Sequence, residues 1–235
     1  MQNWKVLPHG QLLEVDDNLR TVTGDIEMPL MKLQRRMTVV RLRDSRLVIF
    51  SAIALAENEM AALEAFGQPA FLIVPNDRHR LDAKIWKERY PGVKVVAAPG
   101  ARANVEKLVA VATTAPDFGD PAVQFIVVAG TLQHEAALLV RSSHGATLVL
   151  NDIVGNIRDA QGIGGWLLHL AGFAGTRPRI PRVVRMAMVK DPAALRAQLL
   201  QWSRIETLQR ILVSHGAPID RDPKAVLQVL AQSLV

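Results

Sequence analysis

Alternation of apolar and polar side chains dominates the first fifty residues and predicts strands joined by turns. Residues 18–23 carry β-branched side chains, and Gly24-Asp25 follows them with residue types that favour a turn. Residues 37–42 and 47–50 are two further apolar, β-branched runs, and a short polar segment separates them. Because its arms are apolar and its turn is polar, the segment 37–50 is predicted to form a β-hairpin.

The spacing of apolar positions changes to that of a helix over residues 56–66, and Gly67 stands where a C-cap glycine belongs. The wholly apolar runs 71–74 and 94–98 then frame a helical pattern at 82–89. Short apolar runs between helices are typical of strands buried on both faces. The order strand, helix, strand, helix, strand therefore predicts a parallel portion of sheet.

The middle of the chain returns to strand patterns. Three apolar runs at 125–128, 136–140 and 146–150 are joined by short turns, which predicts an antiparallel meander. A glycine-rich stretch, Gly155 to Gly175, follows, and the sequence leaves open whether it is a lid or a loop-rich connection.

The C-terminal part combines helices with one more strand. Residues 177–182 contain two prolines and are expected to be extended, whereas Asp191 as N-cap and Pro192 predict an amphipathic helix over 192–209. A short strand at 211–213 and a closing helix at 223–234 complete the chain. Since no repeat or linker interrupts it, we expect a single α/β domain over residues 1–235.

Composition fits a domain with an aliphatic core. Hydrophobic residues make up 49% of the 235 residues but aromatic residues only 5%. The absence of cysteine excludes disulfides and thiolate metal sites and agrees with a reducing compartment. No apolar run approaches the roughly 20 residues that span a bilayer, and residues 1–5 lack the features of a signal peptide. We therefore expect a cytoplasmic protein without a membrane partner.

The net charge of +6 raises the question of an anionic partner. The basic residues are scattered, with small clusters at 35–36, 41–43 and 177–185, and aromatic residues are not interleaved with them as a base-stacking surface requires. This favours a small-molecule substrate or ligand over nucleic acid. An RNA-processing role would require a contiguous basic groove leading to the site. The oligomeric state stays open.

Four potential metal ligands stand beside predicted strands. His79, Asp152 and His215 each follow an apolar run, and His134 precedes one. In parallel α/β sheets, ligands bind at the carboxyl ends of strands. Imidazole nitrogens with carboxylate oxygens suit zinc, iron or manganese. Each residue also has an ordinary structural reading, as a cap, a turn residue or a backbone hydrogen-bond partner.

The order and spacing of these residues resemble the metallo-β-lactamase-like superfamily over about Leu12 to Gly216. The resemblance implies an α/β fold, a four-layer αββα sandwich with mixed sheets. Members of the family carry a His-x-His-x-Asp-His metal motif after a buried strand. A histidine before a meander strand, an aspartate after a strand and a histidine ending a late strand follow it. The later ligands match His134, Asp152 and His215.

The first motif departs from the family's pattern. Asn76 stands where the first ligand histidine is expected, and only His79 and Asp82 remain, with Asp77 as a further candidate oxygen ligand. The segment resembles a branch of the superfamily in which Pro-Asn-x-x-His replaces the usual motif. The resemblance therefore implies one metal ion, or none, in place of a dinuclear site.

The resemblance implies a mononuclear metal-dependent hydrolase acting on an anionic ester or phosphoester. One ion, zinc or else iron or manganese, would be held by His79, His134 and His215. Asp152 would coordinate the ion or orient the attacking water, and Asp82 would support His79 from outside. The alternative is a catalytically silent domain of this fold that binds a small molecule or a protein. The hydrolase hypothesis requires His79, Asp152 and His215 to converge within about 5 Å.

Overall fold

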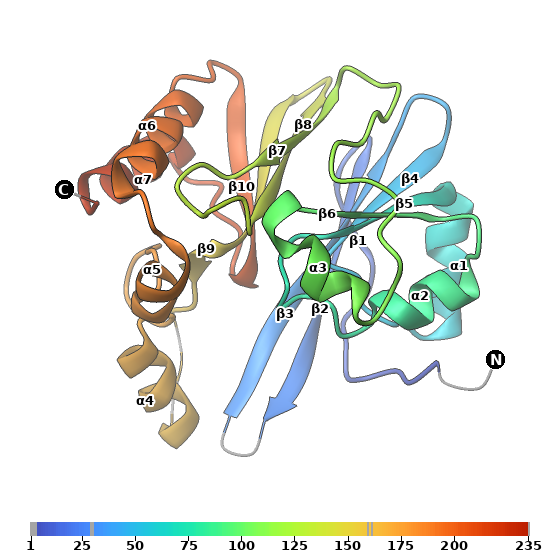
Figure 1. Cartoon of the computed structure of the whole chain (residues 1–235), viewed down its shortest axis with the longest axis horizontal. Coiled ribbons are helices and arrows are strands. Elements are labelled where there is room, and N and C mark those ends of the chain that lie inside the picture. The colour runs from blue at the N-terminus through green and yellow to red at the C-terminus, as the bar shows by residue number, and fades with distance from the viewer. Residues whose placement is uncertain (1–3, 29–30, 159, 161, 235) are drawn as a thin grey trace.

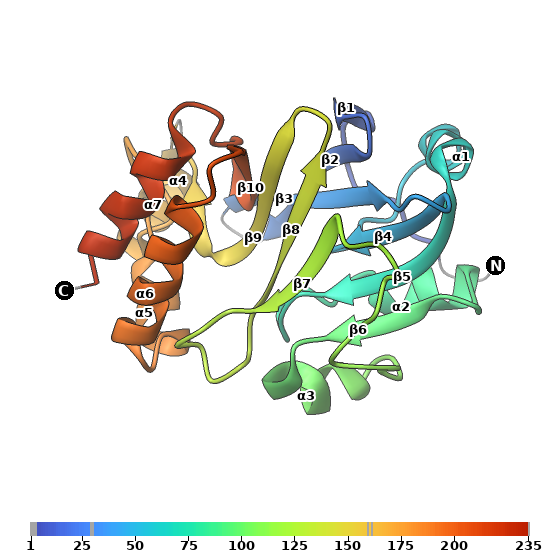
Figure 2. The same ribbon diagram turned by 90° about the horizontal axis from the view of Figure 1, so that it is seen from above.

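The computed structural model of the chain places two β-sheets face to face, with helices on their outer faces (Figures 1 and 2). It describes residues 4–28, 31–158, 160 and 162–234. Residues 1–3, part of the segment compared above with a signal peptide, lie outside the described residues. No helix within the described ranges is long and apolar enough to cross a bilayer.

The first sheet has six strands in the order β1-β2-β3-β4-β5-β6. They are β1 (Leu13–Asp16), β2 (Leu19–Met28), β3 (Met31–Arg41), β4 (Arg46–Phe50), β5 (Gln68–Val74) and β6 (Lys94–Ala97). β3 and β4 pair in antiparallel fashion, which confirms the predicted hairpin. β4, β5 and β6 are parallel, which confirms the predicted parallel portion.

The turn predicted at Gly24-Asp25 is wrong. β2 continues through both residues, which pair with Arg35 and Gln34 of β3. The partner strand supplies a regular register across this point, so strand pairing outweighs the local turn preference. The pairing extends β3 across the sheet and brings residues 34–36 toward the end of the second sheet, as the contact between Arg36 and Val213 shows.

The second sheet has the order β10-β9-β8-β7. Its strands are β7 (Val123–Val127), β8 (Ala136–Ser142), β9 (Gly145–Asn156) and β10 (Leu208–Gly216). β7, β8 and β9 form the predicted antiparallel meander, and β10 adds to β9 in parallel. The register of this last pair shifts, because Val213 lies opposite Leu150 whereas His215 lies opposite Gly155. β9 therefore bulges where Asp152 stands.

Seven α-helices are found among the described residues. They are α1 (Glu57–Phe66), α2 (Ala83–Arg89), α3 (Arg102–Glu106), α4 (Gly162–Ala171), α5 (Arg182–Met188), α6 (Pro192–Ser203) and α7 (Pro223–Gln232). The predicted helices at 56–66, 82–89 and 223–234 correspond to α1, α2 and α7. α6 is shorter than predicted, because β10 already begins at Leu208.

The segment from Gly155 to Gly175 contains α4, and residues 159 and 161 within it lie outside the described residues. The segment 177–182, expected to be extended, pairs with β9 through a bridge between Arg179 and Gly155. α5, which the sequence pattern did not predict, begins directly after it at Arg182.

Buried aliphatic side chains hold the layers together. One cluster packs the first sheet against α1 and α2, and a second packs the other sheet against α6 and α7. A third cluster joins the two sheets, with Phe50 and Phe71 from one side and Leu138 and Val149 from the other. Each such side chain contributes roughly 1.5–3 kcal/mol to the free energy of folding when fully buried. The packed interface between the sheets therefore holds the strand ends, and the side chains on them, in fixed positions.

Candidate metal site

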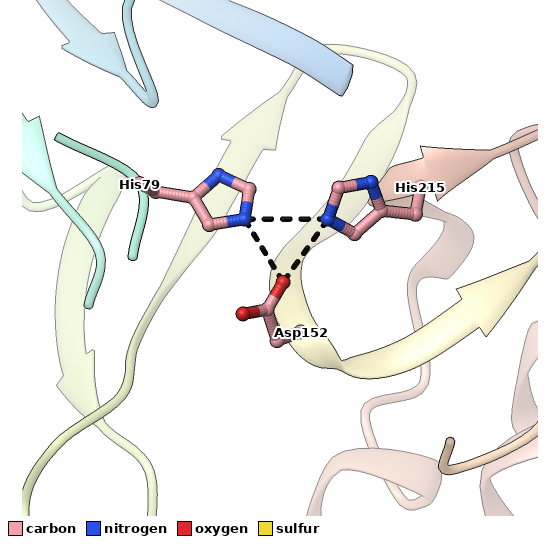
Figure 3. Close-up of side chains that lie close together, drawn as sticks. All are labelled: His79, Asp152 and His215. Atoms are coloured by element: carbon pink, nitrogen blue, oxygen red, sulfur yellow. Dashed lines mark hydrogen bonds and ion pairs between the residues drawn. The ribbon is translucent and has the colours of Figure 1, made fainter. Parts of the chain in front are cut away.

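His79, Asp152 and His215 meet at one point (Figure 3). His79 comes from the loop after β5, Asp152 from the bulge of β9, and His215 from the end of β10. His79 Nε2 lies 2.9 Å from Asp152 Oδ1, and His215 Nε2 lies 3.1 Å from the same oxygen. The two Nε2 atoms are 3.3 Å apart. The three side chains therefore meet the requirement of convergence within about 5 Å.

The backbone fixes the tautomer of His215. Its Nδ1 lies 2.7 Å from the carbonyl oxygen of Gln34, and a carbonyl can only accept, so Nδ1 carries the hydrogen. In a neutral ring, Nε2 then has a bare lone pair, aimed at Asp152 Oδ1. Two facing lone pairs repel each other unless a cation lies between them. The geometry thus requires either a proton on His215 Nε2 or a metal ion at this point.

Charge and burial agree with a site for a cation. Burial by itself would raise the pKa of Asp152, but the charge of His79 and hydrogen bonds from both histidines hold that pKa well below its usual range. Burial by itself would lower the pKa of His215, but the hydrogen bond and charge of Asp152 raise it above its usual range. The carboxylate is therefore ionised and demands a positive partner.

The distances also fit one transition metal ion. Ligands about 2.0–2.1 Å from a tetrahedral ion are about 3.3 Å from one another, and the three ligand atoms are 2.9 to 3.3 Å apart. Two imidazoles and one carboxylate leave a fourth position for water or substrate, as in catalytic zinc sites. The three residues can hold such an ion with little movement.

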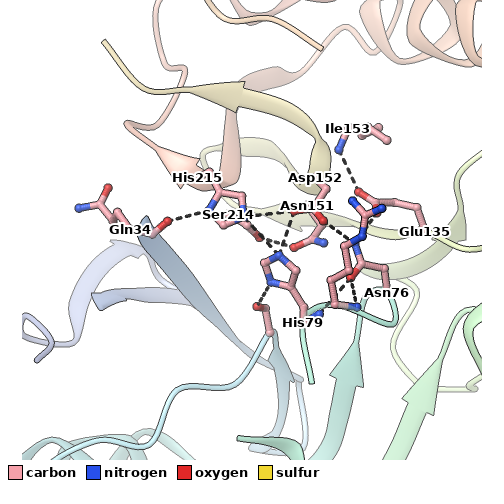
Figure 4. A network of polar contacts seen from close by, with 11 residues as sticks. Gln34, Asn76, His79, Glu135, Asn151, Asp152, Ile153, Ser214 and His215 are labelled. Atoms are coloured by element: carbon pink, nitrogen blue, oxygen red, sulfur yellow. Dashed lines mark hydrogen bonds and ion pairs between the residues drawn. The ribbon is translucent and has the colours of Figure 1, made fainter. Parts of the chain in front are cut away.

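Asn76 organises the loop that carries His79 (Figure 4). Its Oδ1 accepts hydrogen bonds from the amides of Arg78 and His79, at 2.9 and 3.0 Å. Its Nδ2 donates to Asp152 Oδ2 and to Glu135 Oε2, both at 2.8 Å. Since the amide occupies Oδ2, only Oδ1 of Asp152 faces the two histidines. Asn76 therefore favours a single cation position over two.

Glu135 is a buried member of this network that the sequence analysis missed. Besides its contact with Asn76, its Oε1 accepts from the amide of Ile153 at 3.0 Å. Burial, and then the nearby charge of Asp152, raise the pKa of Glu135 to about 8. The contacts of Glu135 with Asn76 and Ile153 fix the bulge that presents Asp152.

The outer nitrogens of both histidines are also held. His79 Nδ1 lies 2.9 Å from the hydroxyl of Ser51, and His215 Nδ1 lies 2.7 Å from the carbonyl oxygen of Gln34. Partners of this kind orient metal-binding imidazoles and set which nitrogen is free to coordinate. Phe173 adds an edge-to-face contact to the ring of His215, with centroids 5.7 Å apart.

Arg36 fixes the backbone around His215. Its guanidinium is buried and donates to the carbonyl oxygens of Val213 at 3.0 Å and of Gly216 at 2.9 Å, the residues that bracket Ser214 and His215. A third bond, at 3.2 Å, goes to the hydroxyl of Thr21. Burial lowers the pKa of Arg36 to about 10. Arg36 therefore ties the first sheet to the end of β10.

Other predicted site residues lie in different surroundings. His134 is not among the residues that converge at this point, and its ring packs against Gly100 instead. Asp82 is buried and accepts from Arg35 at 2.6 Å and from the Ala54 amide at 3.1 Å, so its hydrogen bonds stabilise the first sheet and do not reach His79. Asp77 accepts from Asn104 at 2.9 Å.

The direction of the chain explains why Glu135, and not His134, reaches the polar network. Successive residues of an extended segment point to opposite sides. Glu135, the next residue, points into the network and His134 points away from it. Because the run 136–140 is buried throughout, its sequence pattern could not show which of the two residues points into the network.

A second group of acidic and histidine side chains is an ion-pair cluster. Asp16 lies 2.7 Å from His144 Nδ1 and 2.9 Å from Arg210, and Asp17 is its neighbour. Burial by itself would raise the pKa of Asp16, but hydrogen bonds from His144, Ser142 and others hold it at about 2. Arg210 already neutralises this carboxylate, so the cluster is stabilised without a metal.

Comparison with known proteins agrees with this arrangement at the level of fold. No protein-family model matches the chain, and no curated protein matches its sequence. Solved structures do match. The DIM-1 metallo-β-lactamase is 12% identical, with 98% of this chain and 100% of that one covered and a TM-score of 0.64.

Two further enzymes give similar values. A metallo-β-lactamase from Hirschia baltica is 10% identical, with 95% and 98% coverage and a TM-score of 0.60. FIM-1 from Pseudomonas aeruginosa, in its mono-zinc form, is 11% identical, with 97% of each chain covered and a TM-score of 0.63. This chain therefore has the metallo-β-lactamase fold, as its sequence predicted.

Proposed function

We propose that this chain is a mononuclear metal-dependent hydrolase whose ion is held by His79, Asp152 and His215. The observation that carries the proposal is the convergence of His79 Nε2, His215 Nε2 and the buried Asp152 Oδ1, which lie 2.9 to 3.3 Å from one another. Zinc suits two imidazoles and a carboxylate, and iron and manganese are the other candidates. The mono-zinc form of FIM-1 supports a single ion in this fold.

When bound, such an ion supplies Lewis acidity, which lowers the pKa of a water molecule and polarises a substrate oxygen. The chain's own residues supply the positioning. Ser51 and the Gln34 carbonyl hold the two rings with Nε2 inward, and Asn76 holds Asp152 with Oδ1 inward. Preorganised groups of this kind need no rearrangement during the reaction.

The proposed substrate is an anionic ester or phosphoester. The chain carries 28 lysines and arginines against 22 acidic residues, so its overall field attracts anions. His134 and Asp82 have no part in the proposed chemistry, because neither lies in the cluster of converging ligand atoms.

The alternative is a silent domain that binds a small molecule or a protein. It is favoured by the direct contacts of both histidines with Asp152, since a protonated His215 would satisfy the carboxylate without an ion. The two hypotheses differ in metal content, which a direct measurement can decide.

The test is elemental analysis of protein purified without a chelator or a histidine tag. We expect about one zinc, iron or manganese per chain, lost in His215→Ala and in Asp152→Ala. His169→Ala is the matched control, because this exposed histidine of α4 lies outside the cluster, and it should keep the metal. Absence of metal in the parent protein, even after incubation with each ion, would contradict the hydrolase and leave the silent domain. Phosphodiesters and carboxylic esters are the substrates to screen with the loaded protein.

A further inference from the structure

One face of α4 is apolar and exposed. Ile163, Trp166 and Leu170 are 72%, 63% and 59% exposed. At 100° per residue these positions lie within an arc of about 60°, so they form one continuous stripe. The buried residues of the helix, Gly165 and Leu168, point the other way. We call Ile163, Trp166 and Leu170 the α4 stripe.

Helix α4 lies at the margin of the molecule (Figure 1). Figure 1 shows α4 beside α5 and away from the helices that cover the first sheet. The end of α4 meets the start of α5, since a Cβ on Gly172 would lie 2.6 Å from the Arg182 amide nitrogen. Such exposure of large apolar residues on one helix face is unusual for a free surface and marks a site of interaction.

The chain around the α4 stripe is strongly basic. Residues 156–190 contain six basic residues and one acidic residue, Asp159. Arg158 precedes α4, and Arg177, Arg179 and Arg182 follow it, in a segment that returns to β9 through the bridges Gly155–Arg179 and Ile157–Ala174. The bridge Ile157–Ala174 brings the chain before α4 beside the chain after it, so these arginines gather near the C-terminal end of the helix.

We propose that the α4 stripe docks on the surface of an anionic lipid bilayer, with the flanking arginines on the headgroups. A helix face that exposes apolar residues including tryptophan can lie in the membrane interface, and arginines near the end of the helix can contact anionic headgroups there. From the sequence we expected no membrane partner, because no segment could span a bilayer. Docking at the surface needs no spanning segment.

Charge decides between a membrane and a second copy of the chain. A two-fold dimer places the same patch of both copies face to face, so it would bring two sets of these arginines together. An anionic surface attracts them instead, and each arginine near such a surface strengthens binding roughly fivefold. These arginines therefore favour an anionic lipid surface over a second copy of the chain.

The test is co-sedimentation with vesicles, using the whole chain. The vesicles are either phosphatidylcholine alone or phosphatidylcholine with about one third phosphatidylglycerol, a fraction that gives a strong negative surface potential. We expect the parent to bind the anionic vesicles and salt to weaken this binding. The double variant Trp166→Glu, Leu170→Glu should bind them at least tenfold more weakly. Arg177→Glu with Arg182→Glu should weaken it to a similar degree.

Val229→Glu is the matched control, because Val229 is an exposed apolar residue on another helix, 53% accessible on α7. It should bind like the parent. Failure of the parent to bind anionic vesicles would overturn the proposal, as would equal loss in the Val229 variant. A parent dimer in solution that Trp166→Glu converts to a monomer would also overturn it and assign the stripe to a second copy. Circular dichroism of each variant shows that loss of binding is not loss of fold.

Discussion

Replacing Arg36 by methionine tests how the first sheet positions His215. The guanidinium donates to the carbonyls of Val213 and Gly216, and both carbonyls lie at the end of β10. Methionine fills a similar volume but donates nothing, so these buried acceptors lose their partner. Each buried carbonyl left without a hydrogen bond lowers the unfolding free energy by about 1–3 kcal/mol, and removal of the buried charge offsets part of that loss.

The expected net loss is about 2 kcal/mol of unfolding free energy. For a chain of this size, that lowers the melting temperature by roughly 4–8 °C. The looser end of β10 should also weaken metal binding about 10- to 100-fold, as loss of an orienting contact typically does. Urea denaturation of the metal-free protein measures the first effect, and competition with a chromogenic chelator measures the second.

Arg102→Met is the control, because Arg102 is exposed and pairs with Glu106 one helical turn away, at 2.8 Å. Such a pair contributes about 0.3–0.5 kcal/mol. Equal stability of Arg36→Met and the parent would refute the structural part of the argument. A destabilised Arg36→Met variant with unchanged metal affinity would refute the part that concerns His215.

Three further predictions concern other contacts. Asn76→Ala removes the amide between two buried carboxyl groups, so it should lower the unfolding free energy by about 2–4 kcal/mol in urea. A neutral effect would mean that the amide is dispensable. Gly216→Ala should cost more than about 2 kcal/mol, since φ is +101° and the new Cβ would lie 2.2 Å from the Asn156 carbonyl oxygen. Normal thermal stability would contradict that geometry. The pKa of His144 is raised above 6.5 by Asp16, so its pairing stabilises the fold below pH 6.5 and is lost as pH rises through the raised pKa. Because the pKa of Asp16 is lowered to about 2, the same pairing is also lost as pH falls from 3.8 toward 2. His144→Ala should thus destabilise the protein near pH 5 and have little effect near pH 9. If the variant and the parent had equal urea midpoints at both pH values, the pairing would not contribute to stability.

Much of the fold could be predicted because its strands have strong local patterns. The apolar runs that became β4, β5 and β6 are buried on both faces, so they are apolar without interruption. The meander of β7, β8 and β9 has short turns that a sequence reveals. The pairing of Gly24 and Asp25 with β3 could not be predicted, because it depends on a partner strand and not on the turn residues themselves.

The site was predictable in part. His79, Asp152 and His215 were found because each follows a buried run, and the structure brings them together. Their partners have no local signal. Asn76 and Glu135 interact across 59 residues of sequence, and Arg36 reaches β10 across 177. Such contacts depend on how the sheets pack, and a single sequence does not reveal them.

The most direct test of the central claim is X-ray absorption spectroscopy at the zinc edge, on protein loaded with one equivalent of zinc. We expect two imidazole nitrogens and carboxylate oxygen at about 2.0–2.1 Å from the zinc, with one imidazole lost in His79→Ala and one in His215→Ala. The same spectrum in the parent and in both variants would contradict it, since zinc would then be bound elsewhere.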